Sequence, residues 1–349
     1  MLLKVKGYDG HIYRQILKGN KDDLRQDSVM QQLFVLSSKL LSKQDPNLYI
    51  RSYKVIPISP VCGIIQFVEG SLSIQDYLAE EFKNNDRLFI RGALIRYNIG
   101  EMKYVDAYKT FRKASKSFHE TKKENEKVKL LKTFRQIREK LKPVFRFFFI
   151  EHFKNQADWF LSRIRYCRHT ATNSMVGHVL GIGDRHLNNI LIDVKTGEVI
   201  HIDLGIAFEQ GKALPVPELI PFRLTGEIID GMGWKGVDGV FRKSCEKTMK
   251  VLRQNVGYFL TVLEVFINDP LYSWKMPNKP KNSSHTFNDT GESSNTKAAE
   301  SVILQCRRKL EGHETGEELS VEGQVAKLIT DATNDMNLCT LYYGWKPFL

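Results

Sequence analysis

The sequence has 349 residues, 42% of them hydrophobic and 26% charged, and it carries a formal net charge of +12. That length and composition are typical of a globular protein with one large domain or two lobes. No stretch approaches the roughly 18 uncharged apolar residues of a membrane span, and the first ten residues turn polar too early for a secretory signal. We therefore expect neither a membrane protein nor a secreted one.

Much of the positive charge falls between Lys103 and Arg146, where the pattern is helical. A nucleic-acid-binding surface is one interpretation of such a charge. Blocks of like charge more often form a solvated helix face, and the aromatic residues that would stack on bases are interleaved only near residues 145–149, which are apolar enough to be core. We therefore expect surface helices here.

The first 70 residues predict a small lobe rich in strands. Residues 1–20 have the pattern of a hairpin around the Tyr-Asp-Gly turn, and Asp27 stands where it would cap an amphipathic helix. The apolar, β-branched runs at 49–58 and 62–70 predict two more strands. The second of them ends in a hinge at about 66–70 that leads to the next lobe.

From about Ser73 onward the pattern is helical, and only the stretch 181–205 interrupts it with strands. Residues 277–297 are rich in Pro, Ser, Asn and Thr and predict a mobile loop, and amphipathic helices follow at 300–312 and 320–333. The predicted fold is α+β, with a small β-rich lobe and a large helical lobe.

Within 181–205, two apolar runs flank a turn at Gly197, which predicts a hairpin over 189–203 with Asn189 and Asp203 at the same end. An amide and a carboxylate oxygen at one edge of a hairpin suit Mg²⁺, which takes few protein oxygens and completes its shell with phosphate and water. Asp184 precedes Asn189 by five residues, which is the spacing of the catalytic Asp and metal-binding Asn in protein kinases.

A second motif, at 17–27, places Lys18 at the end of a strand in the small lobe. A lysine in that position can bind phosphate across the cleft if an acid holds its direction. Asp22 and Asp27 are both candidates for that acid.

These motifs together resemble the phosphatidylinositol 3-kinase-related protein kinases, and one of them resembles the ataxia telangiectasia mutated branch of that family. The resemblance covers nearly the whole chain, and its last part is similar to the family's short terminal FATC domain. The motifs are DDLRQD at 22–27, GIGDRHLNNILI at 181–192, HIDLGIAFEQGK at 201–212, PFRLT at 221–225, the branch motif at 230–253 and the terminal segment at 319–349.

The resemblance implies a two-lobed kinase fold with four parts. They are a partial N-lobe at 1–70, without the strands of the glycine-rich loop; a C-lobe at 71–274, with its catalytic loop at 181–190 and activation segment at 203–225; a mobile loop and regulatory helix at 275–318; and the FATC domain at 319–349. Because the loop that covers the ATP phosphates would be absent, we expect the isolated piece to be inactive.

The implied reaction is transfer of the ATP γ-phosphoryl group to Ser or Thr followed by Gln, with Mg²⁺ or Mn²⁺, in double-strand-break signalling and telomere maintenance in the nucleus. The resemblance also implies a DNA-end-binding nuclease complex as partner and a homodimer in the full-length protein. In this scheme Asp184 accepts the substrate proton, His186 donates a hydrogen bond to the transferring phosphoryl group, and Asn189 and Asp203 bind the metal.

The nucleotide would lie against the hinge, with backbone groups near Gln66 and Val68 bonding to adenine and Phe67 closing the pocket. The lysine is one residue further from the first Asp of DDLRQD than in the family, so Lys18 and Lys21 both remain candidates for the phosphate ligand.

For the substrate glutamine we expect an apolar pocket formed by Leu191 and Leu214, with Glu209 accepting from the amide. A phosphoinositide kinase is the first alternative function, but the activation segment offers Lys212 against Glu209 and Glu218 and lacks the basic character that inositol phosphates require. A non-catalytic scaffold is the second alternative, and the presence of every expected catalytic residue argues against it.

Overall fold

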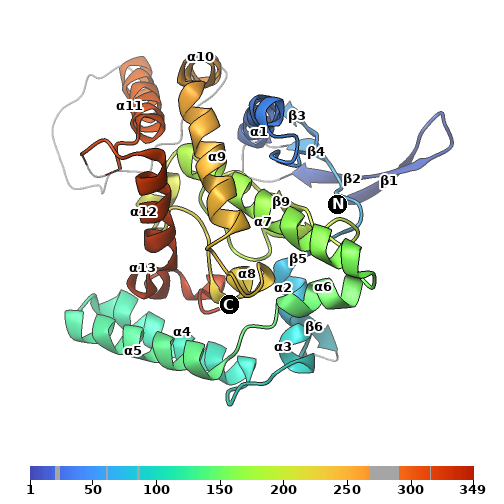
Figure 1. Ribbon diagram of the computed structural model, residues 1–349, viewed down its shortest axis with the longest axis vertical. Coiled ribbons are helices and arrows are strands. Elements are labelled where there is room, and N and C mark those ends of the chain that lie inside the picture. Colours follow the sequence, from blue (N-terminus) through green and yellow to red (C-terminus); the bar gives the residue numbers. More distant parts are fainter. Residues whose placement is uncertain (20–23, 60–61, 85–86, 268–290, 315) are drawn as a thin grey trace.

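The N-terminal part of the chain is a four-stranded antiparallel sheet in the order β1-β2-β4-β3, drawn in blue in Figure 1. The predicted hairpin and the two later strands are therefore confirmed. The strands are β1 (Leu2–Lys6), β2 (Ile12–Gly19), β3 (Val55–Ser59) and β4 (Cys62–Gln66). The computed structural model describes residues 1–19, 24–59, 62–84, 87–267, 291–314 and 316–349.

Helix α1 (Leu24–Gln44) packs against β3 and against α9 (Val240–Gln254), so it connects the sheet to the helical lobe. The predicted cap at Asp27 is wrong. Asp27 lies inside the helix, is 2% exposed, and its carboxylate accepts a hydrogen bond of 2.6 Å from the backbone N–H of Leu204. The Asp27 carboxylate therefore bonds to a residue far along the chain, and it does not bond to the first N–H groups of α1 as a cap would.

The remainder of the chain is mostly helical, as expected. Its central helix is α7 (Gln156–Val179), which packs along α9 and is almost wholly buried from Tyr166 onward. Because α7 ends at Val179, it places the predicted catalytic loop directly after a rigid, buried element. The other helices up to residue 267 are α2 (Ile74–Ala79), α3 (Ala93–Arg96), α4 (Tyr104–Thr121), α5 (Glu124–Lys140), α6 (Arg146–His152), η1 (Gln210–Ala213), α8 (Gly226–Gly231) and α10 (Val256–Ile267).

Two strand pairings break the helical run. The predicted hairpin is present as β8 (Ile190–Asp193) and β9 (Val199–His201), and β5 (Ser71–Ser73) pairs with β8 at its outer edge. A second hairpin, β6 (Glu80–Asn84) with β7 (Arg87–Arg91), lies where we expected helix. Glu80 pairs with Arg91 across it at 2.6 Å, so charges that looked like a helix surface instead face each other across strands.

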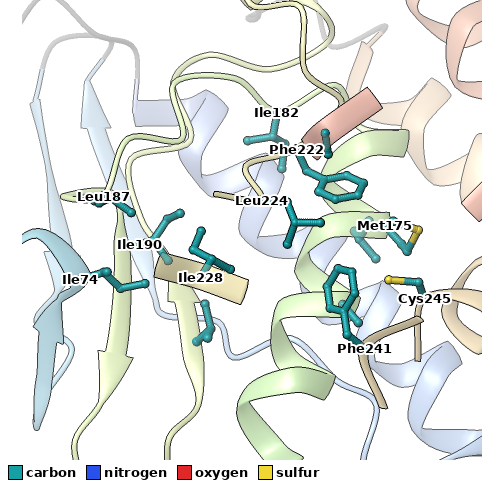
Figure 2. Packing of buried hydrophobic residues seen from close by; sticks show 14 of the residues in the cluster. Ile74, Met175, Ile182, Leu187, Ile190, Phe222, Leu224, Ile228, Phe241 and Cys245 are labelled. Atoms are coloured by element: carbon teal, nitrogen blue, oxygen red, sulfur yellow. The ribbon is translucent and has the colours of Figure 1, made fainter. Parts of the chain in front are cut away.

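The apolar core lies directly beneath the β8–β9 hairpin and the loop before it. Figure 2 shows Ile182, Leu187 and Ile190 of this region together with Phe222 and Leu224, which follow in the predicted activation segment. Met175 of α7 and Phe241 of α9 belong to the same buried cluster. The segment that carries Asp184 is thus anchored on both sides by well-packed side chains.

The basic stretch forms the helix pair α4 and α5, which lies at the bottom of Figure 1. Its apolar stripe, including Phe111, Leu130 and Phe134, is buried, while most of its lysines and arginines are exposed. This is the solvated helix face that the sequence predicts. Among the described residues, no helix is long and apolar enough to cross a membrane.

The C-terminal region consists of α11 (Gly291–Glu311), α12 (Val321–Thr333), α13 (Asp335–Cys339) and η2 (Tyr343–Trp345). Of the predicted loop at 277–297, residues 277–290 lie outside the described part of the chain. From Gly291 onward the chain is already helical, so the loop prediction is wrong for 291–297. The amphipathic helix at 320–333 is confirmed, and α12 packs against α9.

Candidate active site

A cavity of about 480 Å³ opens between the sheet and the helical lobe. Its walls come from β2, β4, the hinge and the β8–β9 hairpin, so distant segments of the chain meet there. It is the size of a pocket for a nucleotide-like ligand and is largely apolar with a few charged groups at one end. The residues that line it include Ile16, Lys18, Asp27, Tyr53, Ile65, Gln66, Phe67, Val68, Leu191, Ile202 and Asp203.

The charged end of the cavity is formed by Lys18 and Asp203. The Lys18 ammonium lies 3.0 Å from Oδ1 of Asp203 and bridges the two lobes. Burial raises the pKa of the nearby Asp27 carboxyl to about 6, against the opposing effects of the Leu204 N–H and of Lys18. Asp27 and Lys18 therefore interact electrostatically, and the orienting role of Asp27 stays a prediction. Lys21 and Asp22 lie outside the described residues.

Asn189 and Asp203 lie at the same end of the hairpin. The register pairs Ile190 with His201, and the Ile202 N–H donates to the Asn189 carbonyl at 3.0 Å. The Asn189 amide nitrogen donates to the Asp184 carbonyl at 3.0 Å, which leaves its oxygen as the atom suited to a cation. One carboxylate and one amide oxygen form a donor set that fits Mg²⁺.

Asp184 and Asp203 both have a φ of 55°, in the left-handed region that residues other than glycine rarely adopt. Such a conformation costs on the order of 1–3 kcal/mol and occurs mostly where the surrounding structure holds it for a function. Burial raises the pKa of the Asp184 carboxyl, although His186 and Arg185 oppose this. Burial also lowers the pKa of His186, whose Nε2 is 3.8 Å from Oδ2 of Asp184.

Arg185 braces the loop. Its guanidinium is buried and donates to the backbone carbonyls of Gly183 and Ile202, each at 2.8 Å, and to that of Asp203. These hydrogen bonds join Gly183 of the catalytic loop to Ile202 and Asp203, which follow β9, and so tie the catalytic loop to the start of the activation segment.

At the hinge, only part of the predicted backbone donor set is available. The Gln66 N–H donates to the Lys54 carbonyl at 2.8 Å and is therefore used within the fold. The Val68 N–H has no acceptor among the described residues. The Phe67 ring lies under the Arg14 guanidinium, with 4.3 Å between the guanidinium carbon and the ring centroid. Phe67 also lines the cavity.

The residues predicted for the glutamine pocket do not come together. Leu191 lies in the wall of the cavity that contains Lys18 and Asp203, and neither Glu209 nor Leu214 lines that cavity. Glu209 forms ion pairs with Lys309 of α11 and with Lys212. Burial raises the pKa of the Glu209 carboxyl, but the two lysines outweigh burial and lower this pKa to about 2. Leu214 is half-buried at the end of η1.

Two further residues contact the catalytic loop, Trp345 of η2 and Glu218 of the predicted activation segment. A hydrogen bond from the Trp345 side chain lowers the pKa of Asp184, and the Trp345 ring lies edge-on to His186, with 6.5 Å between ring centroids. The carboxylate of Glu218 accepts from the Asp184 N–H. No local spacing relates either residue to Asp184, since they lie 161 and 34 positions further along the chain.

Comparison with protein families gives two matches. The model described as phosphatidylinositol 3- and 4-kinase matches residues 13–276, and the FATC domain model matches residues 318–349. Together they cover the cavity, the catalytic loop and the helices α12 and α13, whereas α11 lies between the two matches.

Relatives and solved structures agree with these matches. The chain is 43% identical to the serine/threonine-protein kinase TEL1 of Kluyveromyces lactis over 97% of its own length and 12% of that protein's. It is 40% identical to the serine/threonine-protein kinase ATM of Arabidopsis thaliana over 98% of its length and 9% of the relative's. A structure of the FAT and kinase domain of CtTel1 superposes with a TM-score of 0.83 and 39% identity, covering 100% of this chain and 22% of that one.

Proposed function

Because the chain belongs to the phosphatidylinositol 3- and 4-kinase family and ends in a FATC domain, we propose that it is the catalytic part of an ATP-dependent serine/threonine protein kinase. The observation that supports the proposal is the ion pair of Lys18 with Asp203 in the interlobe cavity. Asn189, whose amide holds the Asp184 carbonyl, lies at the same end of the β8–β9 hairpin as Asp203. The names of the relatives, serine/threonine-protein kinases, favour a protein over a lipid as substrate.

In this proposal the apolar end of the cavity takes adenine. The Val68 N–H at the hinge bonds to the base, and Phe67 and Leu191 close its two sides. Leu191 is thereby reassigned from the peptide to the nucleotide, because it lines the same cavity as Lys18. Lys18 neutralises the phosphates from the small lobe, and Asp27 limits its freedom.

Asn189 and Asp203 would hold Mg²⁺, which when bound would offset the negative charge of the phosphates. Asp184 accepts the proton of the substrate hydroxyl, a role for which its raised pKa is suited. His186 donates a hydrogen bond to the transferring phosphoryl group. Arg185 keeps the loop and the Asp203 turn in one geometry.

For the peptide, we propose selection of Ser or Thr followed by Gln. The activation segment is its binding surface, and Leu214 remains the apolar candidate there. Glu209 is held by Lys309, so it can accept from a glutamine amide only if α11 releases it. The acidic balance of this segment argues against an inositol phosphate substrate.

Broader roles rest on the resemblance to ATM and TEL1 proteins, of which this chain spans 12% or less. On that basis we propose DNA double-strand-break signalling and telomere maintenance in the nucleus, with a DNA-end-binding nuclease complex as partner. A homodimer is supported by a similar solved structure described as the complete CtTel1 dimer with C2 symmetry.

The test uses the full-length protein with a Ser-Gln peptide, its Ser-Ala counterpart and phosphoinositide vesicles. We expect Mg²⁺-dependent phosphorylation of the Ser-Gln peptide alone, and a loss of at least about 100-fold in kcat for Asp203→Ala and for Asp184→Asn. Labelled vesicles with no labelled peptide would show a lipid kinase. Unchanged turnover in both variants would refute the site assignment, and no turnover in any arm would favour a scaffold.

A further inference from the structure

One acid of the activation segment lies directly against the catalytic loop. Both carboxylate oxygens of Glu218 accept from the backbone N–H of Asp184, Oε1 at 2.9 Å and Oε2 at 3.1 Å. Glu218 follows η1 and is half-buried, and its own N–H donates to the Gly211 carbonyl at 3.1 Å. None of the roles assigned so far uses this carboxylate.

Two glycines make room for it. A Cβ atom at Gly183 would lie 2.7 Å from Oε2 of Glu218, and one at Gly211 would lie 2.6 Å from the same oxygen. Side chains at either position would therefore displace the carboxylate. The catalytic loop and the activation segment both lack a side chain at the point where Glu218 passes between them, which indicates a built contact.

The contact acts on a residue in a rare conformation. Asp184 has a φ of 55°, and both of its peptide groups are held by side chains. Its N–H is held by Glu218 and its carbonyl by the Asn189 amide at 3.0 Å. With both peptide groups fixed, the direction in which the Asp184 side chain leaves the backbone is fixed as well.

We propose that Glu218 is a positioning residue for phosphoryl transfer, holding Asp184 in the left-handed conformation that presents its carboxylate to the substrate hydroxyl. This inference rests on the role proposed for Asp184. It also gives the activation segment a direct means of regulating the reaction, since any movement that withdraws Glu218 releases Asp184. Binding of the peptide and geometry of the base are then coupled through one side chain.

The environment of Glu218 agrees with a carboxylate kept there for its geometry. Burial raises its pKa to about 7, and the like charge of Asp184 adds to this, although the Asp184 N–H and Arg185 oppose it. Placing one acid beside another is unfavourable unless hydrogen bonds compensate. The two bonds to Asp184 supply that compensation.

The experiment measures kcat and the KM values for ATP and for a Ser-Gln peptide in the full-length protein. Glu218→Ala removes both acceptors, and we expect kcat to fall by about 100-fold while KM for ATP changes by less than about 2-fold, because Lys18 and Asp203 keep their places. Glu218→Gln keeps one acceptor oxygen and should lose less, roughly 10-fold or below.

Gly211→Ala tests the same contact without changing Glu218. The three heavy atoms nearest to the added Cβ all belong to Glu218, so we expect a loss of kcat between those of the two Glu218 variants. This variant also answers the case in which Glu218→Ala fails to fold.

Glu227 provides a matched control. It is buried on α8, and its Oε2 accepts from the backbone N–H groups of Val144 and Phe145, each at 2.9 Å. Glu227→Gln therefore makes the same chemical change in a buried acceptor whose two hydrogen bonds go to the segment before α6 and not to the catalytic loop. We expect it to change the melting temperature but leave kcat of the folded enzyme unchanged.

A double variant separates this inference from the proposed function. If Glu218 acts through Asp184, Glu218→Ala should lower kcat no further when Asp184→Asn is already present. Additive losses, or a Glu218→Ala kcat within about 3-fold of wild type, would overturn the positioning role while leaving Asp184 as the base. A fully active Asp184→Asn variant would instead refute the proposed function, whatever the result for Glu218.

Discussion

At the scale of single residues, Lys18 supplies the positive charge at the charged end of the cavity. It pairs with Asp203 across the lobes at 3.0 Å, so the site holds a cation and an anion that phosphate and metal can each engage. For Lys18→Met we expect KM for ATP to rise and kcat/KM to fall by about 100-fold, because a charged donor at the transferring group is lost. Steady-state kinetics of the full-length protein measure this.

Lys6→Met is the control for Lys18, since it removes an equally basic, exposed residue of the same sheet. Lys21→Met addresses the alternative that spacing left open. If Lys21→Met loses ATP affinity and Lys18→Met does not, the phosphate ligand has been assigned to the wrong lysine.

Residue types and spacing were sufficient to predict that Asn189 and Asp203 lie at the same end of a hairpin, because a short hairpin fixes which residues share an end. The roles of Asp184, Asn189 and Asp203 stay predictions. They were insufficient for Glu209. Its carboxylate forms an ion pair with Lys309, a hundred positions later in the chain. No local sequence pattern predicts an ion pair between residues so far apart. The same holds for Asp27, whose carboxylate bonds to Leu204 instead of capping its own helix.

At the scale of elements, the C-terminal turn η2 reaches the catalytic loop. A hydrogen bond from Trp345 lowers the pKa of Asp184. In Trp345→Phe that bond is lost while most of the buried ring area is kept, so the pKa of Asp184 should rise. A base with a higher pKa becomes protonated at higher pH as the solution is acidified. We therefore expect the acid limb of the kcat–pH profile to move to higher pH.

Trp234→Phe is the control for this shift, because Trp234 is 84% exposed. An unchanged acid limb in Trp345→Phe, with kcat reduced equally at all pH values, would mean that Trp345 only supports the fold of the terminus.

The sequence predicted elements with strong periodicity and failed where local and tertiary preferences compete. Helices α4, α5 and α7 lie where the apolar pattern places them. The β6–β7 hairpin was missed because its first strand continues directly from α2, with Ala79 ending the helix and Glu80 beginning the strand. Six residues of α2 are too few for periodicity to show where a helix stops.

At the scale of the whole molecule, the cavity exists because several ties hold the sheet against the helical lobe. Lys18 bonds to Asp203, and Asp27 to Leu204. Arg51, just before β3, pairs with Asp193 and Glu198 at the far end of the β8–β9 hairpin. The lobes are thus fixed at both ends of that hairpin, and the ligand site is a property of their arrangement.

A nucleotide that contacts both lobes should therefore stabilise the folded chain as a whole. A ligand that binds only the folded state adds about 2.7 kcal/mol at a hundredfold excess over its Kd. We expect a non-hydrolysable ATP analogue with Mg²⁺ to raise the melting temperature of this 349-residue chain by a few degrees.

The rise should vanish in Asp203→Ala and persist in Lys132→Met, which changes an exposed residue of α5. Because the measurement needs no turnover, it tests the interlobe site even if the chain alone is inactive. An equal rise in Asp203→Ala would place the nucleotide away from the β8–β9 hairpin, and no rise in the wild-type chain would mean that these two lobes do not form the binding site by themselves.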